Sequence, residues 1–356
     1  MSATLPREEL LRRVRRGDPI RGVDLSGAEL DGVDLGGAIF EGVPLVGARL
    51  RGAKLVEAVF IECDLSEADL TEVRAKAVVM HRSKLVGATL VRAGLVRAQI
   101  AQCDARRVDL AGSELTVAAF VDTDLSGANL REVSTDRTTF ATCRVDDVEL
   151  AGATVKQTIF TKADLRTTRL ANARFEAVVL LDANLAGKDL RGLFLEQAQL
   201  TNADLTGADL TGATLSNASL KGANLTGAKL DGVFANNALF AEAKLAGASL
   251  RGAKLRQALF VDADVSGADF SDADLWQGVF HRAQCKKALF SGADLTYADF
   301  SHADLGDAVF RGCNLFRTRL HRVRDEGAVF DTRALALGDD ADEAESEDWA
   351  PPAEGA

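Results

Sequence analysis

The sequence of 356 residues has little proline, tyrosine, tryptophan or cysteine, with 5, 1, 2 and 5 copies respectively. The scarcity of cysteine excludes a small disulfide-stapled domain, and the lack of any apolar run of about 18 residues excludes a membrane-spanning helix. The first sixteen residues carry five arginines without an apolar segment, so a secretory signal is not expected. Hydrophobic residues make up 47% of the chain and charged residues 27%, which is typical of a folded protein.

What the chain has in abundance is a repeat of five residues. From Ile20 onward almost every fifth residue is apolar, and a small residue, usually alanine, stands two positions earlier. A period of five matches neither the 3.6 of a helix nor the 2 of a flat strand, so it predicts a chain that turns a corner in every unit. Proline is nearly absent from the repeat, because each rung must donate backbone hydrogen bonds to its neighbours. Only Pro44 interrupts it.

Several of these units match a known family in their letters. Residues 203–205 and 208–210 read Ala-Asp-Leu, residues 223–225 read Ala-Asn-Leu, and residues 268–270 read Ala-Asp-Phe. In these runs the chain resembles the pentapeptide-repeat proteins, and the resemblance covers about residues 20–330. It implies an all-β fold, a right-handed quadrilateral β-helix with four pentapeptides per coil and about 15 coils. Residues 20 apart would then lie above one another on the same face.

The ends differ from the repeat. Residues 1–19 are expected to form a short helix that caps the first coil, with Pro6 at its start, Glu8 and Glu9 in its first turn and Gly17 at its stop. Residues 20–330 are expected to form one β-solenoid domain. Residues 331–356 carry nine acidic residues and one arginine, so we expect an acidic, disordered tail.

The twenty-residue coil predicts two ladders of stacked rings in the core. The second ladder is on the opposite face and runs from Phe270 through Phe290 and Phe310 to Phe330. Four cysteines occupy the small inward position and Cys285 replaces a core leucine, so all five are expected to be buried and reduced. The first ladder comprises Phe40, Phe60, Phe120, Phe140, Phe160, Phe240, Phe260, Phe280 and Phe300.

The residues just before the first ladder are apolar, although this position is usually Asp, Asn or Lys elsewhere in the chain. If they point outward, they form an apolar stripe that would be a contact surface. The alternative is that they simply favour strand geometry. The predicted stripe comprises Ile39, Val59, Val79, Ile159, Val179, Leu239, Leu259 and Val279, with Ala119 between them.

A second candidate surface lies near the C-terminal end, where aromatic residues occupy outward positions with arginines nearby. Aromatic residues with arginine are the usual anchors of protein interfaces. The alternative is a cap that closes the last coil under the tail. The candidate residues are Trp276, Tyr297, Phe316, Arg317 and Arg319, with Arg322 and Arg324 close by.

Two irregular places remain. Lys188 and Leu193 occupy small inward positions in adjacent units, which predicts a kink, a bulge or a buried ion pair. His281, His302 and His321 lie near one another on the twenty-residue ruler and could bind a metal together with a carboxylate. Their corner positions are more typical of surface turns, so no metal site and no cofactor are predicted.

No catalytic motif stands out, and the carboxylates read as corner residues in solvent, so we expect no enzyme. The sequence predicts a scaffold or adaptor that binds other proteins along a rigid surface. It predicts no direct nucleic-acid or membrane binding, and the missing signals and reduced cysteines favour the cytoplasm.

Two alternatives stay open. Some pentapeptide-repeat proteins protect DNA gyrase from inhibitors by imitating duplex DNA, but the repeat region here carries a net charge of only −5 once the ends are set aside. The stretch from Cys313 through Phe330 with the acidic tail also resembles pentapeptide-repeat proteins associated with bacterial type VI secretion, which implies an accessory or adaptor for effectors.

Overall fold

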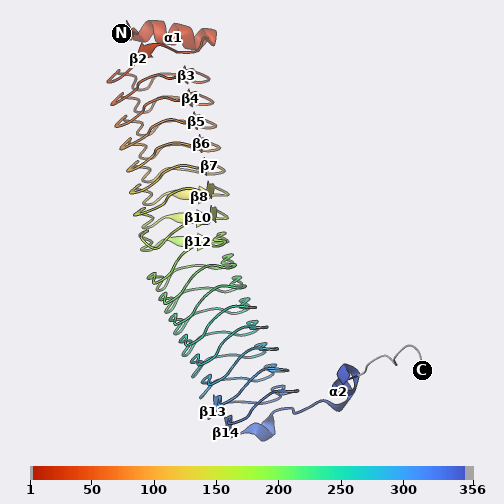
Figure 1. Cartoon of the computed structure of the whole chain (residues 1–356). Helices are drawn as coiled ribbons and strands as arrows, with labels where there is room; N and C mark the ends of the chain where they lie inside the picture. Colours follow the sequence, from red (N-terminus) through yellow and green to blue (C-terminus); the bar gives the residue numbers. More distant parts are fainter. Residues whose placement is uncertain (1–2, 349–356) are drawn as a thin grey trace, which may run out of the picture. The chain divides into compact units, whose positions relative to one another are not determined.

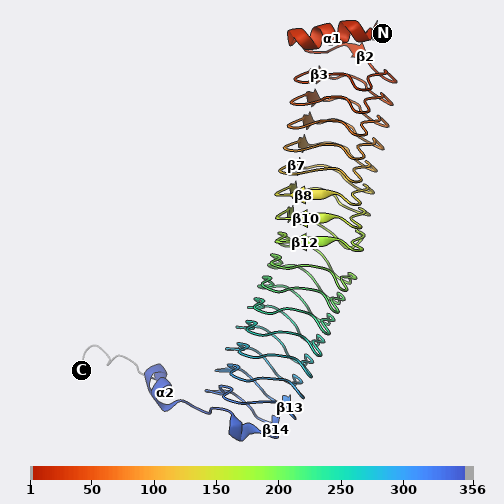
Figure 2. The same cartoon turned by 180° about the vertical axis from the view of Figure 1, so that it is seen from behind.

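The computed structural model describes residues 3–348 (Figures 1 and 2). The chain divides into two compact units, which are taken separately below. Unit 1 comprises Met1–Ala186 and Leu193–Asp204, and unit 2 comprises Gly187–Gly192 and Leu205–Ala356. The division falls at the irregular residues Lys188 and Leu193. The elements of unit 2 are β13 (Val309–Phe310), β14 (Val329–Phe330), the 3-10 helix η1 (Arg333–Leu335) and α2 (Ala341–Asp348). The elements of unit 1 are β1 (Ala3–Thr4), α1 (Arg7–Arg16), β2 (Val23–Asp24), β3 (Ile39–Glu41), β4 (Val59–Ile61), β5 (Val79–His81), β6 (Gln99–Ala101), β7 (Ala119–Val121), β8 (Ser134–Asp136), β9 (Thr139–Ala141), β10 (Thr154–Lys156), β11 (Ile159–Thr161) and β12 (Arg174–Glu176).

Both units are parallel β-solenoids with a coil of twenty residues. In unit 1 Phe40 on β3 pairs with Phe60 on β4, and in unit 2 Phe310 on β13 pairs with Phe330 on β14. Isolated bridges keep the same spacing, as between Lys244 and Asp264. The predicted quadrilateral β-helix of about 15 coils is therefore confirmed.

Nearly every corner places one residue in the left-handed region, two positions after the large core residue. Glycine adopts this region without strain, as at Gly27 with φ of 65°. Many corners carry other residues, however, and bulky or β-branched side chains are costly there. The most conspicuous are Val117, Thr142, Tyr297 and His302, with φ of 59°, 51°, 60° and 63°.

In unit 1 the residues on either side of each inward residue of the Phe ladder favour extended backbone, and the largest sheet forms there. Strands β3, β4, β5, β6, β7, β9 and β11 form a seven-stranded parallel sheet, and β8, β10 and β12 form a three-stranded one. Valine, isoleucine and threonine are frequent beside the inward residue, and these types favour extended backbone. In each of the seven strands the central residue is buried and its neighbours are half-buried or exposed.

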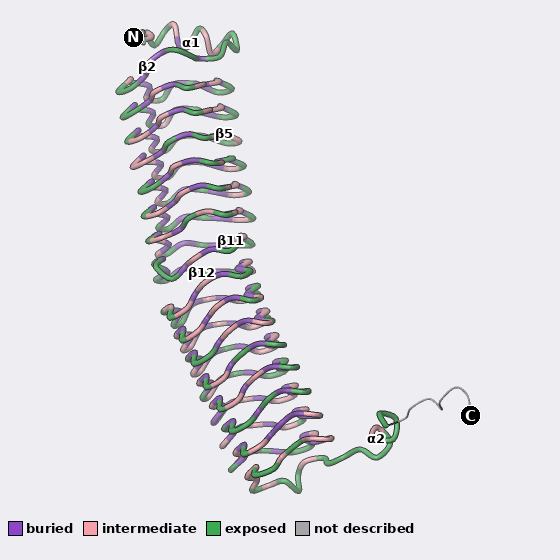
Figure 3. Tube along the Cα trace, viewed as in Figure 1, coloured by how far each residue is buried: buried purple, intermediate pink, exposed green. Residues whose placement is uncertain are grey.

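The core of both units consists of the large fifth residue and the small residue two positions before it, as the alternating buried segments of Figure 3 show. The first predicted Phe ladder contributes stacks to each unit, and the second lies in unit 2. In unit 1 the rings of Phe40 and Phe60 stack at 4.8 Å between centroids, and Phe120, Phe140 and Phe160 form a second stack. These stacks fill a narrow interior that aliphatic side chains complete.

In unit 2 the two ladders interlock. Phe260, Phe280 and Phe300 stack at 4.6 Å on one face, while Phe270 and Phe290 stack at 5.1 Å on the other. Rings of opposite ladders meet edge to face at 5.5–5.8 Å between centroids. Stacked and edge-to-face contacts are both favourable arrangements of aromatic quadrupoles.

Buried hydroxyl groups at the small inward position, and the hydrogen bonds that they and the predicted buried thiols donate, form a feature that the sequence analysis missed. Ser83 Oγ donates to the carbonyl of Phe60, and Ser113 Oγ donates to the carbonyl of Leu90 at 2.7 Å. Each donor lies 23 residues after its acceptor, so the small inward residue of one coil reaches a core carbonyl of the coil before. The same spacing recurs at Cys103, Thr123, Thr138, Cys143, Cys313 and Thr318.

The predicted N-terminal helix is α1, which closes the first coil of unit 1. Leu10 is fully buried, and Gly17 ends the helix in the left-handed region with φ of 73°. The amide of Gly17 donates to Val14 and that of Asp18 to Arg13, which satisfies the last carbonyls of the helix.

The tail is more ordered than the composition suggests. Residues 333–348, which the sequence analysis placed in a disordered tail, contain η1 and α2. Leu337 pairs with Arg319, and the guanidinium of Arg333 lies 4.9 Å from the centre of the Phe330 ring. The acidic sequence folds back because the arginines of the last coils attract it. Residues 349–356 of the predicted tail lie outside the described range.

The five cysteines are free, and four are buried. Burial raises the pKa of Cys103, Cys143 and Cys313 to about 11, and it raises that of Cys285 further. Lys188 is half-buried, and burial lowers its pKa although Asp189 opposes the shift. None of the helices within residues 3–348 is long and apolar enough to cross a bilayer.

Candidate functional site

The predicted apolar stripe of unit 1 lies on the outward side of its seven-stranded sheet. Ile39, Val59 and Val79 follow one another on β3, β4 and β5, and all three are half-buried. Gln99 on β6 and Thr139 on β9 then interrupt the apolar column. Ile159 on β11 and Val179 continue the column, both half-buried, and they pair with each other.

The other outward residue of each strand widens this surface. Ile61 on β4 and Val121 on β7 stand on the same side of the sheet, and both are half-buried. The alternation of a strand places the residues before and after a buried one on the same face, so this signal was present in the sequence. The unit 1 face is therefore an apolar surface whose side chains cover one another in part.

In unit 2 the stripe comprises Leu239, Leu259 and Val279, which pair in successive coils. Leu259 is 38% exposed, while Leu239 and Val279 are half-buried. The next two residues of this column are Asp299 and Arg319, so the apolar character ends there.

The C-terminal end of unit 2 carries a group of exposed apolar side chains, although Phe234 elsewhere in unit 2 is also 50% exposed. Tyr297 is 43% exposed and Phe316 is 48% exposed, and their rings meet edge to face at 5.8 Å. Leu335 of η1 is 51% exposed, and its carbonyl accepts a hydrogen bond from the amide of Arg317. We call Tyr297, Phe316 and Leu335 the C-terminal patch. Tyr297 has a left-handed backbone with φ of 60°, so placing a tyrosine there costs conformational free energy that glycine would not cost.

The remaining predicted residues of this end have different surroundings. Trp276 is half-buried, and the guanidinium of Arg256 lies 5.8 Å from its ring centre. Arg317 is exposed beside the patch. Arg319, in contrast, is half-buried and forms ion pairs with Glu343 of α2 and with Asp299.

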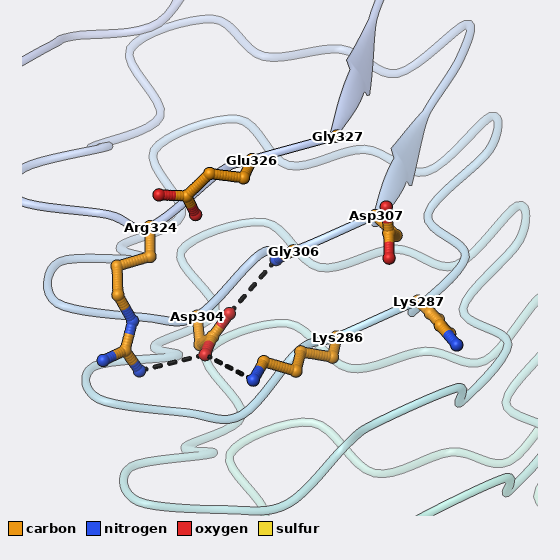
Figure 4. A pocket seen from close by; sticks show the side chains of 8 residues that line it. All are labelled: Lys286, Lys287, Asp304, Gly306, Asp307, Arg324, Glu326 and Gly327. Atoms are coloured by element: carbon orange, nitrogen blue, oxygen red, sulfur yellow. Dashed lines mark hydrogen bonds and ion pairs between the residues drawn. The ribbon is translucent and has the colours of Figure 1, made fainter.

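An open hollow of about 600 Å³ lies on another side of unit 2 (Figure 4). At its centre the buried carboxylate of Asp304 lies 3.2 Å from Lys286 Nζ and 3.0 Å from Arg324, and it accepts the amide of Gly306. Burial raises the pKa of Asp304, but these hydrogen bonds and charges outweigh it and hold the pKa below its usual value. Asp307 and Glu326 add further negative charge, so the hollow does not favour a ligand of either sign.

The histidines of unit 2 lie together as the ruler predicts. The ring centroids of His281 and His302 are 5.3 Å apart, and those of His302 and His321 are 5.5 Å apart. His321 is not a surface turn residue as expected, since it is only 1% exposed. The helix α2 brings Glu347 to this cluster, which the sequence analysis could not place because it treated the tail as disordered.

Basic and acidic side chains of successive coils often lie above one another, although some columns bring two aspartates together, as at Asp104 and Asp124. Lys54 pairs with Asp34 and Arg92 pairs with Glu72, in each case from the following coil of unit 1. In unit 2 Arg282 pairs with Asp262 in the same way. Because a basic side chain so often lies above an acidic one, the acidic corners neutralise locally.

The chain belongs to the pentapeptide-repeat family. The family model described as pentapeptide repeats matches residues 20–55, 45–82, 53–90, 93–131, 179–217, 218–257, 238–277, 258–296 and 293–324. Members of this family are in general structural or binding proteins rather than enzymes. No curated protein matches the chain in a direct sequence search.

Solved structures of pentapeptide-repeat proteins resemble the chain. HetL of Nostoc sp. strain PCC 7120, described as involved in heterocyst differentiation regulation, is 25% identical over 86% of this chain and 97% of its own, with a TM-score of 0.20. QnrB1, described as a plasmid-mediated fluoroquinolone resistance protein, is 15% identical over 75% of this chain and 88% of its own, with a TM-score of 0.24. A protein of the Arabidopsis thaliana thylakoid lumen is 30% identical over 35% of this chain and 79% of its own, with a TM-score of 0.20. At these TM-scores the superpositions carry no argument about a partner.

Proposed function

We propose that the protein is a non-enzymatic scaffold that binds another protein through the C-terminal patch of unit 2. The observation that carries this proposal is the exposed Tyr297–Phe316 pair. Two aromatic side chains, each more than two fifths exposed, leave apolar area in water that a partner would cover. The exposed Arg317 beside them supplies the charged rim that is typical of such interfaces.

The position of Tyr297 strengthens the argument. A tyrosine in the left-handed region costs on the order of 1 kcal/mol relative to glycine, and glycine occupies many equivalent corners of this chain. A side chain that is exposed and strained contributes little to folding. We therefore expect Tyr297 to contribute to binding at the surface rather than to folding.

The half-buried apolar face of unit 1 supports the same class of function through a second surface. Its side chains are half-buried rather than exposed, so less apolar area remains to be covered than at the C-terminal patch. Val59 on β4 is the central residue through which this surface can be tested.

The pairing of acidic with basic side chains on successive coils weighs against the DNA-mimic alternative, in which the protein would protect a gyrase or another topoisomerase. Duplex DNA presents about one negative charge per 1.7 Å of axis without interruption. Here the column that begins at Glu29 meets Arg49 in the next coil and Arg169 further on. The secretion-adaptor alternative predicts the same patch and differs only in the partner, so it is an outcome of the test below.

The test compares quantitative affinity capture by the full chain with capture by the double variant Tyr297→Gly, Phe316→Ser. We expect the variant to lose its specific partner proteins by about tenfold or more, because anchor residues contribute roughly 2 kcal/mol each. Its stability should change by less than about 1 kcal/mol, because glycine relieves the corner strain. The matched control is Asn237→Gly with Leu289→Ser, which changes one corner and one exposed apolar residue elsewhere in unit 2.

Capture that depends on neither Tyr297 nor Phe316 contradicts the patch. If Val59→Asp alone abolishes capture, the binding surface is the unit 1 face instead. Protection of purified gyrase against an inhibitor, lost on reversing the acidic corners and retained in the patch variant, would replace the proposal with the DNA-mimic function.

A further inference from the structure

The end of unit 2 brings two histidines and one carboxylate to a single point. His302 Nε2 lies 3.0 Å from Glu347 Oε1, and His321 Nε2 lies 3.5 Å from Glu347 Oε2. One nitrogen of each ring and one carboxylate oxygen all lie within 4.8 Å of one another. Ligands around a tetrahedral cation at about 2.1 Å would be about 3.5 Å apart, so modest side-chain rotation closes the set.

The chemistry at His321 is unusual for a side chain with purely structural contacts. The residue is 1% exposed, yet its Nε2 has no hydrogen-bond partner among the described residues. Buried polar atoms without partners are rare and costly. This orphaned atom faces the carboxylate of Glu347 and the ring of His302.

The surroundings supply negative charge, and among residues 3–348 Arg322 is the basic side chain that pairs with Glu347 and would compete with a cation for it. Helix α2 carries Asp342, Glu343, Glu345 and Asp348 in addition to Glu347. Arg322 Nε lies 3.2 Å from Glu347 Oε2, but the same guanidinium also pairs with Asp348 at 2.6 Å. Arg322 can therefore remain with Asp348 when Glu347 turns toward a cation.

We propose that His302, His321 and Glu347 form a site for a divalent transition cation such as Zn²⁺, which fastens α2 to the last coils of unit 2. Two imidazoles and one carboxylate are a ligand set that zinc accepts, with a fourth position for water. His302 and His321 belong to successive coils, and Glu347 belongs to the tail. The cation would thus link the solenoid to a segment that otherwise depends on surface ion pairs.

Binding requires a change of tautomer at His321. The amide of Asp340 donates to His321 Nδ1 at 3.1 Å, so the proton of the neutral ring is on Nε2 in this arrangement. A ligating Nε2 must lose that proton, and Nδ1 must then carry one. The carboxylate of Asp339 is 3.9 Å from Nδ1 and is the acceptor that can replace the Asp340 amide. Asp339 is accordingly a positioning residue, in the arrangement in which a carboxylate orients a zinc-bound histidine.

The experiment titrates the full chain, freed of any affinity tag and of bound metal, with Zn²⁺ by calorimetry and with Co²⁺ by absorption spectroscopy. We expect one equivalent to bind, with the visible bands of a four-coordinate Co²⁺ complex. Substitution of His321→Gln or Glu347→Gln should weaken binding by at least about tenfold, and Asp339→Asn by about tenfold to a hundredfold. Zn²⁺ should also slow hydrogen exchange of residues 341–348.

Two control variants share the environment without belonging to the site. His281→Gln changes the histidine of the same column two coils earlier, and Glu345→Gln removes one charge from α2. Both should bind within about twofold of the unaltered protein. Glu347→Gln lies on an exposed helix, so it tests the site even if His321→Gln fails to fold. The proposal is overturned if no equivalent binds, if binding is insensitive to His321→Gln and Glu347→Gln, or if the control variants weaken binding as much as the site variants do.

Discussion

Units 1 and 2 share one coil length but are stabilised by different means. Unit 1 has ten of its strands in two extended parallel sheets, and several of its small inward positions carry a serine, threonine or cysteine that donates to the coil before. Unit 2 has mostly isolated bridges, alanine at nearly every small inward position, and two interlocking Phe ladders. The same backbone can therefore be held by hydrogen bonds or by ring packing.

The difference appears in packing quality as well. Unit 1 contains an apolar cavity of about 10 Å³ between Phe140, Val145 and Phe160, with room for about one water-sized group. Val145 stands at a large core position that leucine usually fills. The family model leaves residues 132–178 unmatched, and this segment contains the cavity. The match therefore fails where the alanine and leucine pattern gives way to threonine and valine.

The largest expected change in the free energy of unfolding compares the ring packing of unit 2 with that of unit 1. Phe280→Ala removes two stacked and two edge-to-face contacts, while Phe60→Ala in unit 1 removes one stacked contact. We expect Phe280→Ala to cost about 3–5 kcal/mol and to exceed Phe60→Ala by about 1–2 kcal/mol. Urea unfolding followed by hydrogen exchange in each unit measures both. Equal losses would show that ring contacts add nothing beyond burial.

A smaller effect tests the buried hydroxyls. Ser113→Ala removes a donor to Leu90 and an acceptor for the amide of Ala93, so we expect a loss of about 1–2 kcal/mol. The reverse change in unit 2, Ala253→Ser, should cost less than about 1 kcal/mol, because the carbonyl of Leu230 lies at the same spacing of 23 residues. A large loss at Ala253 would mean that the spacing of 23 residues alone is not enough to accommodate a buried hydroxyl. Thermal and urea unfolding of both variants provide the measurement.

The smallest effect concerns the thiols. Because the folded-state pKa values of Cys103, Cys143 and Cys313 are raised to about 11, their neutral forms stabilise the fold below the ordinary thiol pKa of about 8.5, and this contribution is lost as the pH rises toward 11. Near pH 7 the thiols are neutral in both the folded and the unfolded chain, so they should not make the free energy of unfolding change with pH. A thiol reagent at pH 8 should label the native chain far more slowly than the unfolded one, with Cys285 of unit 2 the slowest. Rapid labelling of Cys285 would contradict its burial.

Much of the fold could be predicted from the sequence, because the period of five indicates a corner in every unit and the resemblance to pentapeptide-repeat proteins implies the coil of twenty residues that stacks Phe40 on Phe60. The same ruler brought His302 and His321 together and placed Tyr297 beside Phe316. What it could not supply was the path of the tail, since helix α2 depends on ion pairs with Arg319 and Arg322 of the last coils rather than on any local pattern. Glu347 was invisible for that reason, and so was the engagement of Arg319. The buried donors were missed because serine and threonine look like turn residues until the coil places them inward.

The left-handed corners have a consequence for how this surface can change. Coil pairing uses backbone groups and the core uses inward side chains, so the residue at each corner is independent of both. Successive corners of a column are about 4.8 Å apart, the spacing of neighbouring strands. Within each unit the corners thus form a regular grid on which a side chain can be exchanged without altering the core, although side chains of successive corners can contact each other, as Arg282 and Asp262 do. New recognition properties can therefore arise by single substitutions that leave the fold intact.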